Sequence, residues 1–271
     1  MFFLVLRIII APLVVVGGTF VQRRFGHVVS GLVIGLPLTS LPLLWLVAIQ
    51  HGTLFARSMS SASLVGCVAE IVMIWTYATL ARRLSPTRTL LASLAVFTLT
   101  AGVIDLFTFS ALLGGLLAAG GFAIALRFWP TTIDEPVEGS GRYRLTLRAV
   151  LAAGFSFLVI TMAGRIGPGL SGLAEALPIM SLVIAFITHQ EIGAHATSRF
   201  LQGVVKGSFS YVASILVFTE LMASGPIWIA ILVALGVAGT AQVAVQYLDS
   251  WPGFKRVISY SFFSARVSLE S

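Results

Sequence analysis

Charged residues are scarce in this sequence, and their scarcity excludes a water-soluble globular protein. Only 10% of the 271 residues are Asp, Glu, Lys or Arg, whereas 58% are hydrophobic. A soluble domain carries about 25% charged residues. The surplus apolar surface of this chain needs lipid to cover it, so the sequence predicts an all-α polytopic membrane protein.

Cysteine and catalytic motifs are also nearly absent. Cys67 is the only cysteine, so the chain cannot form an intramolecular disulfide. The sequence has no P-loop, no HExxH zinc motif and no nucleophile elbow. We therefore expect no enzymatic activity, no cofactor and no bound metal. His189, Glu191 and His195 lie close together in "THQEIGAHATSR", but a metal site would need more ligands, and a solvated inner loop is the simpler interpretation.

A signal peptide is lacking as well. No basic region precedes the first apolar run and no small-x-small cleavage site follows it, so we expect a retained first span. Asp105 marks the expected turn between the fourth and fifth spans, and 130–144 is the only polar linker of any length. Runs of about 17–25 apolar residues can cross a bilayer. The sequence predicts nine: 3–22, 28–49, 58–81, 88–105, 107–128, 145–164, 169–188, 197–221 and 225–247.

Positive residues are strongly biased to one side of these spans. With the N-terminus outside, the outer side holds three: Arg7, Arg57 and Arg165. The inner side holds thirteen: Arg23, Arg24, Arg82, Arg83, Arg88, Arg127, Arg142, Arg144, Arg148, Arg199, Lys255, Arg256 and Arg266. Basic loops face the cytoplasm, so we expect the N-terminus outside and the C-terminus inside, in a bacterial-type inner (plasma) membrane. Cytoplasmic loops then account for the formal charge of +7, and we expect no nucleic-acid partner.

An 18-residue stretch of sequence, which we call the repeated line, occurs twice in similar form. "RFGHVVSGLVIGLPLTSL" at 24–41 and "RIGPGLSGLAEALPIMSL" at 165–182 agree at nine of eighteen positions, 141 residues apart. Chance would give about one or two matches at ordinary residue frequencies. Further matches at the same offset extend the repeat in both directions, so each half of the chain is a related four-span unit.

The repeat predicts four segments. These are a four-helix repeat at 1–106, a linking helix and cytoplasmic loop at 107–144, a second four-helix repeat at 145–247 and a cytoplasmic tail at 248–271. The single linking span reverses the second unit, which gives a 4+1+4 inverted topology. Inverted repeats give secondary transporters two conformations that open to opposite sides. The alternative is a gene duplication that yields a stable bundle without transport.

The repeated line also predicts two interrupted helices. Gly31 and Pro37 lie in the second span, and Gly172 and Pro178 lie at the matching positions of the seventh. Proline removes an intrahelical hydrogen bond and clashes with the preceding turn, whereas glycine permits close helix approach. We expect a break in both spans that faces a cavity, with two serines one turn beyond proline supplying hydroxyl groups: Ser40 and Ser181.

Three short runs within the first repeat resemble a known family of membrane proteins. The runs "LxLR", "RRFG" and "SGLxxGLPLTSLPLLWL" resemble the small four-span inner-membrane proteins of the GlpM type, which are placed loosely with drug/metabolite-transporter-like proteins. The resemblance covers each half, at 4–106 and 145–247. It implies that this chain is similar to two such units fused by an added helix, and it transfers no binding or catalytic residue.

Ionisable residues at membrane depth are costly and indicate function. Glu70 in the third span and Lys206 in the eighth lie at similar depths, so we expect them to meet. Their pair is either a static ion pair or one that breaks when a proton or substrate binds Glu70. Glu175 lies three residues before Pro178, and it and Glu70 are the candidate proton carriers. Asp105 lies nearer the outer surface, and we expect it to be interfacial.

Taken together, these patterns favour a secondary transporter or flippase for a small polar or amphipathic solute, with proton coupling as an option. Two alternatives stay open. One is a non-transporting assembly or lipid-binding subunit, and the other is an intramembrane enzyme acting on a lipid-linked substrate. We expect membrane lipid as a partner and a monomer or homodimer.

Overall fold

The computed structural model describes residue 20 and residues 24–37, 40–130, 169–223 and 225–250. Every regular element within these ranges is a helix, which confirms the all-α prediction. The helices are α2 His27–Ile34, α3 Ser40–His51, α4 Thr53–Leu80, α5 Pro86–Ile104, α6 Ala111–Arg127, α8 Ile179–Glu191, α9 Ala194–Leu221 and α10 Ile227–Ser250. Residues 169–175 are also helical, and we call them the 169–175 helix.

Five apolar segments within the described ranges are long enough to cross a membrane. They are Thr53–Leu80, Pro86–Ile104, Gly169–Glu191, Ala194–Leu221 and Ile227–Leu248. Ser40–His51 and Ala111–Arg127 are shorter apolar helices. The chain is thus a helical membrane protein. Two of the nine expected spans, 3–22 and 145–164, lie outside the described residues, so the full number of spans stays a prediction.

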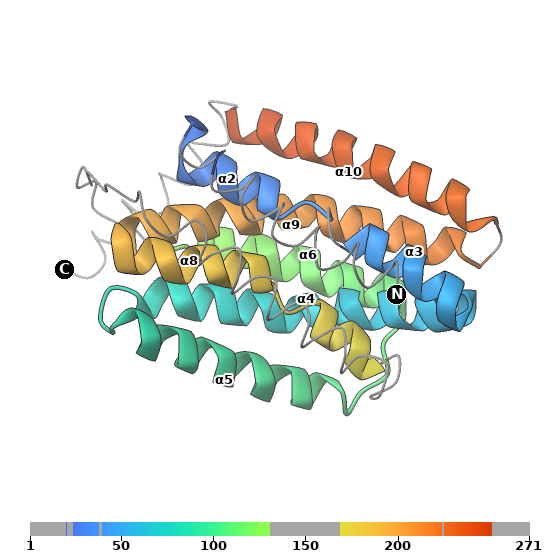
Figure 1. The fold of residues 1–271 in the computed structure, drawn as a ribbon, viewed down its shortest axis with the longest axis horizontal. Helices are drawn as coiled ribbons and strands as arrows, with labels where there is room; N and C mark the ends of the chain where they lie inside the picture. The colour runs from blue at the N-terminus through green and yellow to red at the C-terminus, as the bar shows by residue number, and fades with distance from the viewer. Residues whose placement is uncertain (1–19, 21–23, 38–39, 131–168, 224, 251–271) are drawn as a thin grey trace, which may run out of the picture.

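Helices α4 and α9 form the centre of the bundle and run antiparallel. Their most apolar windows are 67% and 61% buried, against 17% and 22% for α5 and α10. Helices α5 and α6 pack on α4, while α2 and α10 pack on α9, so α5 and α10 lie at opposite edges (Figure 1). Their exposed faces carry large apolar side chains, as a lipid-facing surface requires: Leu91, Leu99, Leu232 and Val243.

Two glycines set the turns that lead into the central helices. Gly52 (φ 87°) directly precedes α4 and Gly193 (φ 114°) directly precedes α9. Side chains rarely adopt this backbone conformation, so glycine is the residue that fits both turns. The two glycines are 141 residues apart, the same offset as in the repeated line.

Both segments that carry the repeated line are interrupted. The first helix stops at Ile34, and the next begins at Ser40. In the second segment the 169–175 helix ends before Pro178, which precedes α8 with φ −81° and ψ 69°. Proline has no N–H to donate to the preceding turn, and this accounts for the position of the second break.

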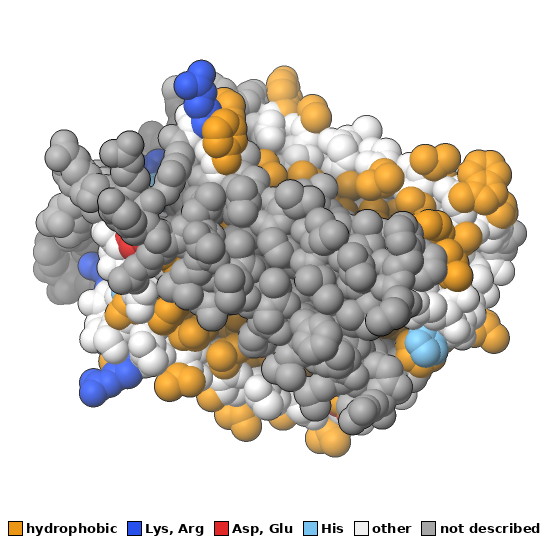
Figure 2. Space-filling view, in the orientation of Figure 1, with side chains coloured by type: hydrophobic (Ala, Val, Ile, Leu, Met, Phe, Trp, Pro, Cys, Tyr) orange, Lys and Arg blue, Asp and Glu red, His pale blue; other side chains and the backbone are white. Residues whose placement is uncertain are grey.

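Arginine side chains gather at one end of the bundle. The turn after α4, the start of α5, the end of α6 and the starts of α2 and α9 meet there, and Figure 2 shows Lys and Arg side chains at the left end of the visible face. That end holds Arg24, Arg82, Arg83, Arg88, Arg127 and Arg199. Among the described arginines, Arg57 alone lies at the opposite end, where α4 begins and α9 finishes.

Candidate functional site

A buried polar cluster lies where the 169–175 helix contacts α4 and α9. The Ser63 hydroxyl of α4 donates a hydrogen bond to Glu175 Oε2, and the Tyr211 hydroxyl of α9 donates to the same oxygen over 2.8 Å. Ser63 Oγ and Tyr211 Oη are themselves 2.6 Å apart, and either atom can be the donor. Three oxygens from three helices therefore contact one another in a closed triangle.

The second carboxyl group of the site comes from α4. Glu70 is 7% exposed, and its polar neighbours are Cys67 and Ser208 of α9. Glu70 and Glu175 are near enough for their carboxyl groups to interact electrostatically. The structure thus brings the two predicted proton carriers to one site. We call Ser63, Cys67, Glu70, Glu175, Ser208 and Tyr211 the acid cluster.

Lys206 lies elsewhere, contrary to the expected contact with Glu70. The partners described for Glu70 are Cys67, Ser208 and Glu175, and Lys206 is half-buried on another face of α9. Residues two apart on a helix differ by about 200° in direction. Since Ser208 faces Glu70, Lys206 points away from it. The similar depths expected for Glu70 and Lys206 therefore did not imply contact between their side chains.

The glycines of the repeated line lie at close helix contacts. A Cβ atom on Gly31 would collide with backbone atoms of α9 around Phe200, Gly203 and Val204. A Cβ atom on Gly172 would collide with Met59, Ala62 and Ser63 of α4. Each interrupted segment therefore packs directly against a central helix, α2 on α9 and the 169–175 helix on α4. The contact at Gly172 also brings Glu175, one turn further on, to Ser63.

Ser40 and Ser181 do not join this cluster. Both are buried, at the beginnings of α3 and α8 respectively. Neither forms a hydrogen bond with the acid cluster among those described for the covered ranges. Pro37 lies within the first break and Pro178 at the end of the second. Ser40 and Ser181 therefore follow the breaks, whereas Glu175 precedes its break.

A cavity of about 550 Å³ opens at the end of the bundle that holds Arg57. Its charged lining residues are Arg57, Asp105 and Glu220, and its apolar lining includes Leu173 of the 169–175 helix. Asp105, expected to be interfacial, follows the end of α5 at this cavity. Ala62, adjacent to Ser63, also lines it, so the cavity reaches the neighbourhood of the acid cluster.

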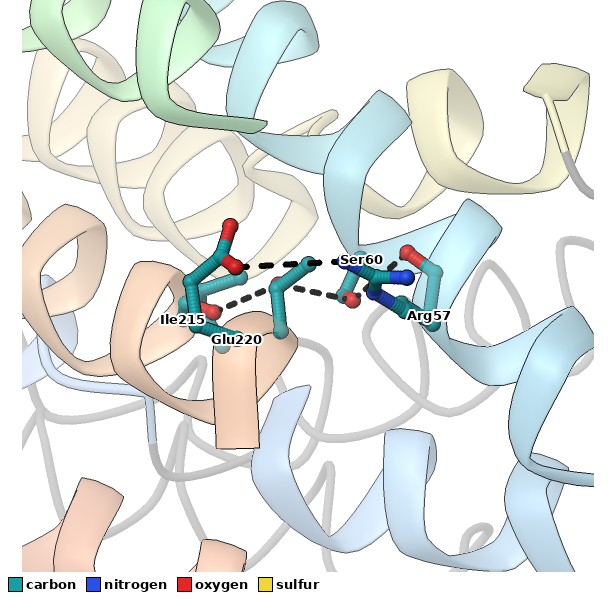
Figure 3. A network of polar contacts seen from close by, with 5 residues as sticks. Arg57, Ser60, Ile215 and Glu220 are labelled. Atoms are coloured by element: carbon teal, nitrogen blue, oxygen red, sulfur yellow. Dashed lines mark hydrogen bonds and ion pairs between the residues drawn. The ribbon is translucent and has the colours of Figure 1, made fainter. Parts of the chain in front are cut away.

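The charged groups of the cavity belong to a polar network between α4 and α9. Figure 3 shows Arg57 and Glu220 pointing toward one another, with Ser60 beside them. Arg57 Nη2 lies 3.8 Å from Glu220 Oε2, and both side chains are exposed. Below this pair, Thr219 Oγ1 donates to Ser60 Oγ over 2.8 Å. A half-exposed ion pair contributes little stability, so these charges are available to a solute in the cavity.

The histidines between α8 and α9 differ from the expected solvated loop. His189 lies in the last turn of α8, is 8% exposed and packs its ring against Tyr77 at 5.9 Å. His195 is in the first turn of α9. Only two residues separate these helices, so there is little loop to solvate. No group of three potential metal ligands occurs within the described residues.

Sequence reasoning missed four members of the site: Ser63, Cys67, Ser208 and Tyr211. Tyr211 and Ser208 are the residues 141 positions after Glu70 and Cys67, so the repeat offset could have pointed to them. Ser63 has a valine at the matching position, Val204, and serine is common in membrane helices. Its role depends on its contact with Glu175, which no local pattern encodes.

The arrangement can bind protons or a polar group at membrane depth, since carboxyl and hydroxyl oxygens supply both donors and acceptors. No family model, curated protein or solved structure matches this chain.

Proposed function

We propose that this protein is a secondary transporter or flippase that moves a small polar or amphipathic solute across the membrane. One observation carries the proposal. Two carboxyl groups, Glu70 and Glu175, are held together in the bundle centre beside an interrupted helix, and a 550 Å³ cavity reaches toward them from one end. Ionisable groups at this depth are costly and are retained where they act on ions or substrates.

We further propose the inverted 4+1+4 repeat as the basis of this activity. Two features support it. Helices α4 and α9 begin and end at positions 141 residues apart, at Thr53–Leu80 and Ala194–Leu221, yet they run antiparallel. The glycine contacts also exchange at that offset: Gly31 meets Gly203, and Gly172 meets Ala62. A two-fold axis in the membrane plane would generate this exchange.

Transport would use the break before α8. The 169–175 helix lines the cavity through Gly169 and Leu173, and it carries Glu175 into the acid cluster. Because residues 176–178 are not helical, this helix can tilt without dragging α8 with it. Tilting would change access from the cavity to the cluster, and the matching break between α2 and α3 would serve the opposite side.

The orientation completes the proposal. The end that gathers arginines would face the cytoplasm, which places the cavity and Arg57 outside and suits an inner (plasma) membrane protein. Cysteine substitutions at residues 24 and 165 should react with a membrane-impermeant thiol reagent from the inside and the outside respectively. Position 165 lies outside the described residues. Labelling of both from the same side would make the repeat parallel and remove the inverted mechanism.

The function itself is tested by flux. Profiling of metabolites and lipids in a deletion strain would nominate solutes, whose uptake into proteoliposomes is then measured under an imposed pH gradient. Glu70→Gln and Glu175→Gln should lower the flux at least tenfold, while Glu191→Gln, at the far end of α8, serves as the matched control. If no nominated solute moves and both acid variants keep the cellular phenotype, the protein is an assembly or lipid-binding subunit instead.

A further inference from the structure

We propose that the cavity at the Arg57 end of the bundle binds a small organic cation, with its charged group at Asp105 and its apolar body against the hydrophobic part of the wall. This inference names the class of solute for the proposed transport, and the role of the cavity as an entry site rests on that proposed function. Binding itself does not rest on transport, and it is tested separately.

The cavity has the size and the mixed lining of a site for a small organic molecule. Its volume is about 550 Å³, and pockets for such ligands measure about 300–1,000 Å³. Helix α4 and the 169–175 helix contribute Val65 and Leu173 to its wall, and α5 contributes Ile104. A solute bound here therefore buries an apolar body while its polar group meets the charged residues of the wall.

The charges of the wall favour a cation over an anion. The charged lining residues are Asp105, Glu220 and Arg57, so two negative charges and one positive charge leave a net charge of −1. Arg57 Nη2 lies 3.8 Å from Glu220 Oε2 (Figure 3), and these two charges compensate one another. The remaining carboxylate belongs to Asp105, which is exposed and forms no ion pair within the described ranges. A solute with one positive charge would balance the wall.

The start of the 169–175 helix compensates Asp105 only in part. Gly169 is the first residue of this helix, and a Cβ atom there would lie 4.0 Å from Asp105 Oδ1. A helix start carries at most about half of a positive charge. The carboxylate therefore keeps a negative charge that a bound cation can neutralise.

Two phenylalanines next to this carboxylate also favour a cation. Phe107 and Phe109 follow Asp105 in the segment between α5 and α6, and both line the cavity. Their ring centroids lie 6.1 Å apart, and the ring planes are tilted by 51°. The face of an aromatic ring attracts a cation through its quadrupole. A carboxylate followed by two aromatic rings suits an ammonium group on a hydrocarbon body.

The part of the cavity nearest the acid cluster leads to further carboxyl groups. Ala62 lines the cavity and is adjacent to Ser63, whose cluster holds the carboxyl groups of Glu70 and Glu175. None of the six residues of the acid cluster is basic. An ammonium group that moved inward would therefore pass from the carboxylate of Asp105 to other oxygen acceptors, whereas an anion would meet no compensating charge in the cluster.

Three probes with one hydrocarbon body separate charge from apolar contact. Phenylbutylamine, phenylbutanol and phenylbutyrate share a phenyl group on a four-carbon chain and carry a positive, no and a negative charge at neutral pH. Saturable binding to the full chain in lipid nanodiscs is measured by equilibrium dialysis, with empty nanodiscs as background. The amine should bind about fivefold more tightly than the alcohol, as an exposed charge pair allows, and the butyrate should bind most weakly. Equal affinities for amine and alcohol, or no saturable binding of the amine, would overturn the proposal.

Two variants should change amine binding in opposite directions. Asp105→Asn removes the unpaired carboxylate and should weaken amine binding about fivefold, while binding of the alcohol stays the same. Arg57→Gln removes the positive charge of the wall and frees Glu220, so it should strengthen amine binding. A variant that only disturbed the fold would not bind more tightly. Glu191→Gln, at the far end of α8, is the matched control. Unchanged amine affinity in Asp105→Asn, or weaker affinity in Arg57→Gln, would contradict the site.

Flux measurements distinguish failure of this site from failure of the proposed function. Amine binding that Asp105→Asn weakens, without flux of any nominated solute into proteoliposomes, would keep the site and reject the transporter. Flux of a nominated solute without amine binding would keep the transporter and reject the site.

Discussion

The two glycine contacts of this protein, α2 against α9 and the 169–175 helix against α4, have the same geometry but different chemistry. In the first contact glycine faces glycine, because Gly31 meets Gly203 and Gly35 meets Gly207. In the second, glycine faces alanine: Gly172 meets Ala62, and Ala176 meets Gly66. The α2–α9 contact therefore has no side chain at these positions, and the other contact keeps one small side chain in each pair.

The two contacts also differ in polarity. Ile34 in α2 occupies the position that corresponds to Glu175 in the 169–175 helix. The first contact is a close, apolar backbone packing that favours a fixed arrangement. The second carries a carboxyl group that contacts Ser63 and Tyr211, so its stability depends on polar contacts as well as on packing. The two contacts therefore differ in what holds them together: apolar packing alone in the first, and packing with polar contacts in the second.

The largest effect is expected from filling the all-glycine contact between α2 and α9. Gly31→Ala places a methyl group against backbone atoms of Phe200 and Val204, which cannot move without shifting α9. Overpacking of this kind costs about 1–3 kcal/mol or more, so we expect a marked drop in thermal stability in detergent. Gly102→Ala in α5 is the matched control, because no atom lies within 4 Å of its Cβ position. Equal stability of the two variants would show that α2 and α9 are not closely packed.

A smaller and reversible effect is expected at the other contact. Gly66→Ala brings a second methyl group to within 2.5 Å of Ala176 Cβ, and we expect a loss of about 1–3 kcal/mol. Adding Ala176→Gly should recover most of it, because glycine then stands on the opposite side of an otherwise unchanged contact. Thermal unfolding of the two single variants and the double variant measures the recovery. No recovery would mean that the two contacts are not equivalent in geometry.

Glu70 and Lys206 should behave as independent residues. Glu70→Gln alters a buried carboxyl group beside Cys67 and Ser208 and is expected to cost about 1–3 kcal/mol. Lys206→Met acts on another face of α9, so the double variant should show the sum of the single effects within about 0.5 kcal/mol. Recovery of stability in the double variant would instead establish the ion pair that the sequence suggested.

The sequence did not predict the direction in which side chains point around a helix. Pattern and composition were sufficient to predict a helical membrane protein, and interrupted helices are observed in both segments that carry the repeated line. Depth placed Glu70 and Lys206 at one level, but contact depends on rotation about α9, and Ser208 is the residue that faces Glu70. Tyr211 and Ser63 reach Glu175 only because the 169–175 helix packs on α4. Such contacts between segments more than a hundred residues apart require the fold itself.

The smallest effect is expected from two tyrosines whose contact residues, Glu175 and His189, lie on either side of the same break. Tyr211 bonds to Glu175 before the break, so Tyr211→Phe should cost about 0.5–1.5 kcal/mol. Tyr77 packs against His189 after the break, and its hydroxyl is buried with no hydrogen-bond partner among the described residues. Removing an unsatisfied buried hydroxyl costs nothing and can stabilise, so Tyr77→Phe should match or slightly exceed the wild type in thermal unfolding. A loss in Tyr77→Phe as large as that in Tyr211→Phe would show that the hydroxyl of Tyr77 has a polar partner, and the contrast between a polar contact before the break and apolar packing after it would then fail.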